Sequence, residues 1–297
     1  MKRVLTCILN DKAGSNSAAD ARALINQVAA KRGWEARVLI SSDGADLNVL
    51  AAEARAFGGL VVGGGGDGTI AAIAAALVGT DSALGVLPMG TLNHFAKDLG
   101  IPVELEKAVQ TLFTGKVVRV DVGEVNGRIF LNNSSIGFYP RIVQEREREQ
   151  RQGSSKWVAF VRAAALIVQQ SRTLHVELNE DHSHRQSYDT PFVFIGNNRY
   201  ALAGLEIGTR AILDGGKLWV CAPPYASRLT LITLALEALL GFVHDADLAA
   251  FETEQTDVHM HRDHVQVATD GEVNVMRTPL HYCIRPGALR VVVPSAD

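Results

Sequence analysis

Short apolar runs alternate with amphipathic segments over the first hundred residues. We expect strands at residues 4–9, 36–40, 60–62 and 83–87, and helices at about 17–31, 45–56, 69–78 and 91–99. Gly33 closes the first of these helices, and Gly100 and Pro102 stop the last. Strands that alternate with helices are typical of a doubly wound parallel sheet. The pattern therefore predicts an N-terminal α/β domain.

The pattern changes after about residue 116. Two alternating segments, 117–125 and 128–136, flank Asn126-Gly127, which is the strongest short signal for a β-hairpin. Further strands are expected at 174–178, 192–195, 218–221, 265–268 and 273–276, with helical insertions at about 140–171 and 228–242. We therefore divide the chain into the α/β domain, residues 1–122, and a mostly antiparallel β-sandwich domain, residues 123–297. A last strand is expected at 289–293, and the sequence leaves open whether it belongs to the second domain or returns to the first.

Composition and charge narrow the class of protein. Of 297 residues, 47% are hydrophobic and 21% are charged, which is typical of a folded globular chain. The formal charge of −3 argues against a general nucleic-acid binder. Cys7, Cys221 and Cys283 have neither a disulfide nor a zinc spacing, which favours a reducing, cytoplasmic location. The longest apolar stretch, 229–243, contains polar residues, so we expect no transmembrane segment.

The most informative stretch is Gly63-Gly64-Gly65-Gly66-Asp67-Gly68-Thr69. It follows an apolar strand and opens a helix. Glycines let the backbone turn sharply and approach an anion, and the helix N-terminus adds partial positive charge. Because four consecutive glycines are more than a turn requires, we predict that this loop binds phosphate groups.

Two further features indicate which phosphate compound binds. Gly63, Gly65 and Gly68 match the dinucleotide fingerprint, but the next strand ends at residues 87–90 without the acidic residue that this fingerprint requires. Asp67 would repel a pyrophosphate unless a divalent cation lay between them. The loop therefore suits a magnesium–nucleotide complex better than NAD.

A second loop, residues 88–93, again joins a strand to a helix, and Thr91 stands in position to cap that helix. In a parallel sheet such loops gather outside the C-terminal ends of the strands. We therefore expect one crevice to be lined by residues 10–14, 41–42, 65–69 and 90–93.

The two glycine motifs together resemble the diacylglycerol kinase catalytic family, which groups bacterial lipid kinases with sphingosine and ceramide kinases. The matching residues are Gly-Gly-Asp-Gly-Thr at 65–69 and Gly-Thr-Leu-Asn-His-Phe-Ala at 90–96. Residues 10–14 resemble the first nucleotide loop of the family, 270–272 its acidic motif and 286–289 its closing segment. The resemblance covers nearly the whole chain. Gly-Gly-Asp-Gly alone would be less specific, since NAD kinases and phosphofructokinases share it.

The resemblance implies a division of roles. Asp67 is expected to act through Mg²⁺. Glu272 is favoured as the general base that takes the proton of a lipid hydroxyl, with Asp270 shaping the site or binding metal, and the reverse assignment stays open. From the residues alone, the Asp270-Gly271 turn indicates only a hairpin. The residues expected to hold ATP are Asn10, Lys12, Gly14, Ser41 or Ser42, Gly65, Gly66, Gly68, Thr69, Thr91 and Asn93.

Two positions depart from the family pattern. His94 stands where many members have Asp, so it alters the site, marks a subgroup or simply lies on a helix face. Gly215, which follows Asp214, replaces an Asp through which bacterial relatives often bind a structural Mg²⁺. That replacement puts such a metal site in doubt.

Other polar and apolar clusters have simpler interpretations. The segment Asp257 to His264 carries candidate metal ligands, with 257, 259 and 261 on one strand face, but a solvated strand surface is preferred. The alternating charges at 145–149 predict a solvated helix. Residues 157–168 and 229–243 are expected to be core. The alternative hypothesis is that these two segments, together with the β domain, line a cleft that binds acyl chains.

We therefore expect a cytoplasmic lipid kinase that contacts the inner face of the membrane peripherally and phosphorylates a lipid alcohol with ATP and Mg²⁺. Diacylglycerol is the default acceptor by resemblance; phosphatidylglycerol, sphingoid bases and ceramide stay open. A homodimer is also left open. The alternatives are an NAD-kinase-like phosphotransferase and a nucleotide- or lipid-binding module that has lost catalysis.

Overall fold

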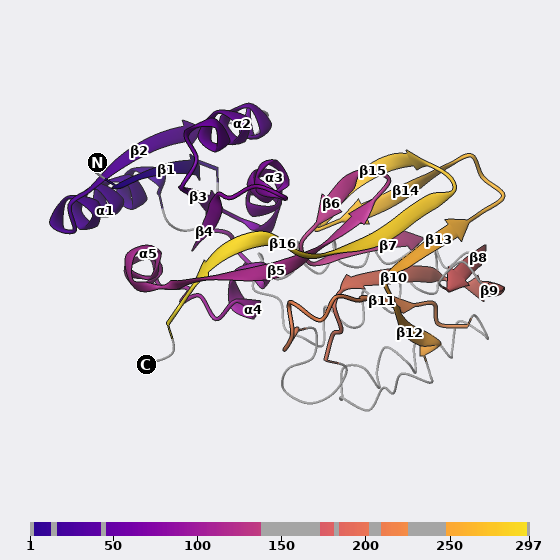
Figure 1. Cartoon of the computed structure of the whole chain (residues 1–297). Helices are drawn as coiled ribbons and strands as arrows, with labels where there is room; N and C mark the ends of the chain where they lie inside the picture. The colour runs from indigo at the N-terminus through magenta and orange to yellow at the C-terminus, as the bar shows by residue number, and fades with distance from the viewer. Residues whose placement is uncertain are drawn as a thin grey trace, which may run out of the picture. The chain divides into compact units, whose positions relative to one another are not determined.

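A computed structural model describes residues 3–12, 17–42, 46–137, 173–180, 184–201, 209–224 and 248–295. The chain forms two compact units (Figure 1). Unit 1 consists of Met1–Val122 and Pro286–Asp297, and unit 2 consists of Gly123–Arg285. Unit 1 is an α/β domain with a parallel sheet and unit 2 is built from antiparallel strands, so the predicted fold class is confirmed.

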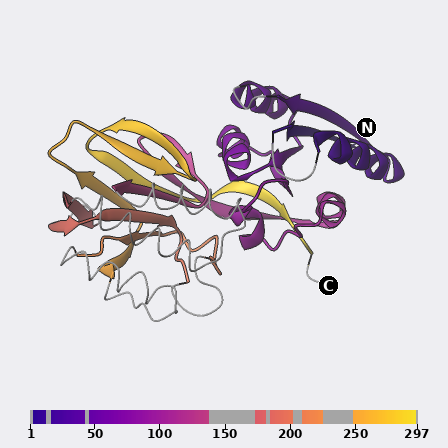
Figure 2. The ribbon, with the colours of Figure 1, turned by 180° about the vertical axis from the view of Figure 1, so that it is seen from behind.

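Unit 1 is a parallel sheet with the strand order β2-β1-β3-β4-β16. Helix α1 packs beside α5, and α2 packs beside α3, so helices cover both faces of the sheet (Figure 2). The strands are β1 (Arg3–Asn10), β2 (Trp34–Ser41), β3 (Leu60–Gly65), β4 (Ala83–Pro88) and the end of β16 (Leu280–Val293). The helices are α1 (Ala18–Lys31), α2 (Leu47–Phe57), α3 (Asp67–Leu77), α4 (His94–Asp98) and α5 (Leu105–Thr114).

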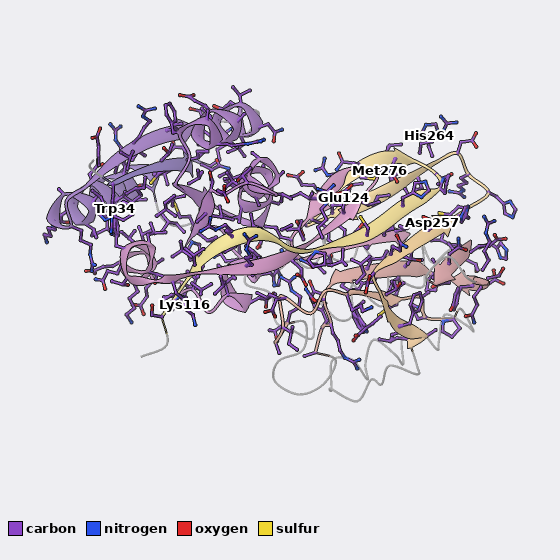
Figure 3. All side chains as sticks on the ribbon, viewed as in Figure 1. Trp34, Lys116, Glu124, Asp257, His264 and Met276 are labelled. Carbon is purple, nitrogen blue, oxygen red and sulfur yellow. The ribbon has the colours of Figure 1, made fainter. Side chains whose placement is uncertain are left out.

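Burial on both faces explains why the central strands are continuously apolar. In β1, residues Leu5, Ile8 and Leu9 are fully buried, as is Cys7. Burial raises the pKa of the Cys7 thiol from 9.0 to about 12, because the apolar core disfavours the thiolate. At the start of β2, Trp34 meets the ring of Phe113 edge to face, with 5.6 Å between the ring centroids (Figure 3).

The final segment of the chain belongs to unit 1. The strand expected at 289–293 is the end of the longer β16, which runs parallel to β4 with Arg290 opposite Ala83. The N–H of Gly287 donates to Oδ1 of Asp121 at 2.8 Å, and the carbonyl of Ala288 accepts from the N–H of Gly79 at 2.9 Å. These contacts fix the chain terminus beside the strands that it completes.

Unit 2 contains two antiparallel arrays of strands. One has the order β12-β11-β10-β7-β14-β15, and in the other β16 pairs with β13, β13 with β8 and β8 with β9. Buried residues of both arrays, among them Ile136, Val193, Leu178 and Tyr282, form one core, so the arrays pack face to face. The strands are β5 (Lys116–Val125, shared with unit 1), β6 (Arg128–Phe130), β7 (Asn133–Gly137), β8 (Leu174–Glu180), β9 (His184–Thr190), β10 (Phe192–Asn197), β11 (Leu218–Cys221), β12 (Ala250–Thr253), β13 (Gln255–His259), β14 (His264–Thr269) and β15 (Glu272–Arg277).

Several sequence-based expectations are corrected. The segment 128–136 is not one strand: β6 pairs with β5, whereas β7 pairs with β10 and β14, and residues 131–132 separate them. Helix α4 begins at His94 instead of residue 91, and α5 was not predicted at all. The helices expected at 140–171 and 228–242, with the charged and apolar segments inside them, lie outside the described residues.

Among the residues that the structure describes, no helix combines the length and the apolar character needed to cross a bilayer.

Candidate active site

The strand order of unit 1 reverses between β1 and β3. From β1 the chain passes to β2 on one side, and from β3 it passes to β4 on the other. Open α/β sheets bind ligands at such a switch point, outside the carboxyl ends of the strands. Here Asn10 ends β1 and its Nδ2 donates to Oγ1 of Thr69, which follows β3, at 3.0 Å. Two predicted nucleotide-binding residues therefore meet at the switch point.

Two glycines of the first loop, Gly64 and Gly65, have no room for side chains. A Cβ on Gly65 would lie 2.6 Å from Cβ of Thr69, and a Cβ on Gly64 would lie 2.5 Å from Cδ2 of Leu9. Gly66 is the N-cap of α3, which begins at Asp67. The first N–H groups of a helix lack partners within the helix and carry partial positive charge. The loop thus presents backbone donors suited to phosphate oxygens.

The second glycine loop lies directly against the first. A Cβ on Gly90 would lie 2.4 Å from Cα of Gly66, and the N–H of Met89 donates to the carbonyl of Gly65 at 3.1 Å. Asn93 closes the second loop: its Oδ1 accepts from the N–H of Gly90 at 2.9 Å, and its Nδ2 donates to the Gly90 carbonyl at 2.8 Å. The buried Asn93 side chain therefore shapes the loop from within.

Asp67 connects the two loops. Its Oδ2 accepts from the N–H of His94 at 3.2 Å and its Oδ1 accepts from the N–H of Phe95 at 3.1 Å, at the first turn of α4. The expectation that Thr91 caps this helix is wrong: the N-cap is Asn93 in a left-handed conformation, and the carboxylate of Asp67 supplies the cap. Thr91 is exposed.

The remaining predicted ATP ligands of unit 1 have different surroundings. Asn10 also accepts from the N–H of the exposed Lys12 at 3.0 Å. Ser41 is 0% exposed, and its hydroxyl donates to Asp46. Gly14 lies outside the described residues.

In unit 2 the acidic motif 270–272 forms the turn of a two-residue hairpin. Thr269 pairs with Glu272, and the two turn residues, Asp270 and Gly271, both have positive φ, at 48° and 87°. Two consecutive positive φ angles define the turn that matches the twist of a hairpin. The predicted hairpin at this motif is therefore confirmed.

The two carboxylates of this turn differ in their partners. Oδ2 of Asp270 accepts from the N–H of Leu131 at 2.7 Å, and Oδ1 accepts from the N–H groups of Asn132 at 2.7 Å and Asn133 at 3.2 Å. The Glu272 side chain is 58% exposed, and its carboxylate accepts from Nη2 of Arg128 at 2.6 Å. Asp270 is thus bound into the fold, whereas Glu272 stays accessible.

Arg128 is a site residue that the sequence analysis missed. Its Nε donates to Oγ1 of Thr269 at 3.0 Å, and its Nη2 donates to the carboxylate of Glu272. The contacts join residues more than 140 positions apart in the sequence, at separations of 141 and 144. No local sequence pattern around Arg128 predicts these two contacts.

A transition-metal site at 257–264 finds no support. Strand β13 ends at His259, so His261 does not share its face, and Asp257 (labelled in Figure 3) pairs with Nδ1 of His281 at 2.6 Å. His261 stacks on His175 with 5.8 Å between the ring centroids. Within the described part of the chain, no group of three or more His, Cys, Asp or Glu side chains is arranged to hold a metal.

The donor set beside the glycine loops fits Mg²⁺. This ion is usually held by one or two carboxylates together with substrate phosphates, without a complete protein cage. Each oxygen of Asp67 accepts one backbone N–H, which leaves acceptor capacity for a further partner. Gly215 stands where bacterial relatives often have a metal-binding Asp. A Cβ on Gly215 would lie 2.8 Å from Oδ1 of Asn198, so a larger residue there would require Asn198 or the backbone to shift.

Comparison with known proteins identifies the family. The model of the Diacylglycerol kinase catalytic domain matches residues 4–125, and that of the YegS C-terminal NAD kinase beta sandwich-like domain matches residues 139–293. A probable lipid kinase YegS-like of Pseudomonas syringae pv. syringae (strain B728a) is 32% identical over 274 residues, which cover 89% of this chain and 86% of the relative. A probable lipid kinase YegS of Escherichia coli (strain K12 / DH10B) is 31% identical over 194 residues, 63% of this chain and 64% of the relative.

Solved structures agree on the fold. A putative diacylglycerol kinase from Bacillus anthracis str. Sterne superimposes with a TM-score of 0.78 at 21% identity, covering 98% of this chain and 97% of that one. With both family models matched and the relatives aligned over most of their length, the chain belongs to the YegS-like lipid kinase family, which carries the diacylglycerol kinase catalytic domain.

Proposed function

We propose that this chain transfers the γ-phosphate of ATP to the hydroxyl of a lipid alcohol, with diacylglycerol as the first acceptor to consider. The observation that carries the proposal is the pair of glycine loops at the switch point of unit 1. There the backbone of Gly90 lies against that of Gly66, and Asn10 donates to Thr69. Phosphoryl transfer depends mainly on positioning and on offsetting negative charge, and exposed backbone N–H groups supply both.

In this proposal the triphosphate binds to the backbone of residues 65–69 and to the start of α3. Asn10, Lys12, Gly14 and Thr91 are assigned to the same nucleotide, and the buried Ser41 and Asn93 support its loops. Asp67 would hold Mg²⁺, which when bound supplies positive charge against the phosphate oxygens. A metal role for Asp270 stays a prediction from the family resemblance.

Glu272 is assigned as the general base. It would take the proton of the lipid hydroxyl as that oxygen bonds to the γ-phosphorus and the bond to the ADP oxygen breaks, leaving a phosphorylated lipid and ADP. Its accessibility and its hydrogen bond to Arg128, which orients the carboxylate, support this role. Asp270, with three backbone N–H partners, is assigned to hold the turn in place.

The acceptor implies contact with a bilayer, because diacylglycerol resides there. We propose peripheral contact with the inner face of the membrane. A soluble acceptor is the second candidate, since the matched C-terminal family model is described as NAD kinase beta sandwich-like.

The test is incubation with labelled ATP and Mg²⁺ and a panel of acceptors, followed by identification of the labelled product. The panel holds diacylglycerol, phosphatidylglycerol, ceramide and a sphingoid base in vesicles, and NAD in solution. We expect label in one lipid and none in NAD. Label in NAD without vesicles would establish the second candidate, and ATP binding without transfer to any acceptor would indicate a module that has lost catalysis.

A further inference from the structure

The segment Leu131–Asn133, here called the 131–133 loop, lies between two opposite charges in unit 2. On its N–H side is the carboxylate of Asp270, described above. On its carbonyl side is the guanidinium of Arg210: Nη1 donates to the carbonyl of Leu131 at 2.7 Å, and Nη2 donates to Oδ1 of Asn132 at 2.7 Å. The loop therefore has an anion on one side and a cation on the other.

A single peptide group connects these charges. The carbonyl of Leu131 and the N–H of Asn132 belong to the same peptide unit, with its oxygen 2.7 Å from Arg210 and its nitrogen 2.7 Å from Asp270. The peptide dipole thus points its positive end at the carboxylate and its negative end at the guanidinium. Hydrogen bonds to charged groups are about twice as strong as neutral ones, and here both charges act on one peptide plane.

Arg210 is itself held firmly. It is 3% exposed, its Nη1 also donates to the carbonyl of Asn197 at 3.0 Å, and its guanidinium lies 5.5 Å from the ring centre of Tyr200. Asn197 reinforces the same loop, because its Nδ2 donates to the Leu131 carbonyl at 2.8 Å. A planar fork that reaches several acceptors at fixed angles is a property of arginine that lysine lacks.

The Asp270 turn is held in place by the same 131–133 loop. Asp270 stands in a left-handed conformation, and besides its three accepted N–H bonds its own N–H donates to the carbonyl of Asn133 at 2.9 Å. Glu272 follows two residues later at the start of β15. A shift of the 131–133 loop would therefore move the turn that carries Glu272.

We infer that Arg210 is a positioning residue for phosphoryl transfer: through the 131–133 loop it fixes Asp270 and with it the placement of Glu272. The inference rests on the proposed function, which assigns the base to Glu272. Arg210 acts through other groups and is assigned no contact with substrate.

The first test compares Arg210→Lys with the wild-type protein in the lipid kinase assay. Lysine keeps the charge but cannot reach both acceptors in the arginine geometry. We expect kcat to fall about 100-fold, as for a displacement of about 1 Å in a reacting group, with KM for ATP unchanged within about twofold. The matched control is Arg185→Lys, because Arg185 is 59% exposed in the same unit and pairs with Glu177; its kcat should equal that of the wild-type protein.

A second variant guards against a general loss of folding. Asn132→Ala removes the side-chain amide whose oxygen accepts from Nη2 of Arg210, and it keeps the backbone N–H that donates to Asp270. We expect kcat to fall about tenfold, since one of the two contacts to the loop is lost. Hydrogen exchange measured by mass spectrometry should rise at 131–133 and 269–272 in both variants, and should be unchanged in residues 60–88 of unit 1.

The outcomes separate this inference from the proposed function. Wild-type kcat and unchanged exchange in Arg210→Lys would overturn the positioning role while leaving the lipid kinase proposal intact. A fall in kcat matched by equal exchange changes throughout unit 2 would also overturn it, since that would be a global effect. If the wild-type protein phosphorylates no acceptor, the proposed function fails, and the role assigned to Arg210 fails with it, whatever the exchange data show.

Discussion

Two aspartates, Asp67 in unit 1 and Asp270 in unit 2, are each bound by backbone N–H groups of their own unit. Asp67 accepts from two N–H groups at the start of α4, and Asp270 accepts from three in the 131–133 loop. Consecutive N–H groups that converge on a carboxylate form a favourable site for negative charge. Glu272 differs, since its carboxylate pairs with the side chain of Arg128 and is 58% exposed. At the residue scale, the carboxylates thus separate into those that organise backbone and one that stays accessible.

This separation predicts different responses to neutralisation. Asp270→Asn should lower the free energy of unfolding by about 1.5–3 kcal/mol, because hydrogen bonds to a charged acceptor are lost in a partly buried place. Glu272→Gln should change it by less than about 0.5 kcal/mol. Both should lower kcat, the latter by about 10²–10⁴-fold for loss of a general base, with ATP binding nearly intact. Denaturant titration and steady-state kinetics measure these quantities.

Glu254→Gln is the matched control for these substitutions, because Glu254 is exposed and its ion pair is with Lys217. Its kcat and stability should match those of the wild-type protein. Wild-type turnover in both Asp270→Asn and Glu272→Gln would refute the assignment of the base to this turn.

At the scale of elements, the proposed nucleotide site depends on how β3–α3 and β4–α4 approach each other. The two loops touch through glycine backbone, and Asp67 at the start of α3 caps α4. Bulky side chains between the loops would separate the backbone donors that the proposal directs at one triphosphate. The glycines at 66 and 90 therefore serve the contact between two elements as well as the turn within each.

The geometry predicts an asymmetry between these two glycines. A Cβ on Gly90 would lie 2.4 Å from Cα of Gly66, whereas a Cβ on Gly66 would lie 3.6 Å from Cα of Gly90, an ordinary contact. Gly90→Ala should therefore destabilise the protein by about 1–3 kcal/mol, as overpacking does. Gly66→Ala should cost less than about 1 kcal/mol. Equal thermal unfolding midpoints for the two variants would contradict this account of the loop contact.

At the scale of the whole molecule, the chain divides its proposed tasks between two units. Unit 1 supplies a parallel sheet whose switch point carries the two glycine loops, and unit 2 supplies an antiparallel sandwich that carries the acidic turn. The chain enters unit 2 through β5 and returns through β16, so unit 1 is completed only by the final residues. Loss of the segment after residue 286 would therefore remove a strand from the parallel sheet of unit 1.

Nucleotide should act on unit 1 in a localised way. With Mg²⁺ and ATP at about 100 times Kd, mass action predicts about 2.7 kcal/mol of stabilisation. Hydrogen exchange should slow at 65–69 and 89–95, and the effect should weaken when EDTA removes the Mg²⁺. Unchanged exchange in both loops at saturating ATP would refute nucleotide binding at the switch point.

Local patterns in the sequence were sufficient for much of unit 1. Apolar runs, glycine loops and helix stops depend on neighbours in the chain, and the loops around Gly65 and Gly90 were predicted as neighbours because parallel strands align their ends. The prediction that Thr91 caps α4 is wrong, because the capping carboxylate comes from Asp67, 27 positions before His94. Likewise residues 128–136 were predicted as one strand, since nothing local marks 131–133 as the partner of Asp270.

The sequence by itself determined the two-part architecture, the glycine loop between β3 and α3 and the acidic turn, because each depends on residue types that are adjacent or regularly spaced. The tertiary structure alone decided which carboxylate is bound into the fold, which arginine faces Glu272, and which arginine grips the 131–133 loop. Those contacts join residues between 78 and 144 positions apart. Backbone groups and charges so far apart in the sequence are brought together only when the strands pack. The periodicity of residues along the chain therefore cannot predict these pairs.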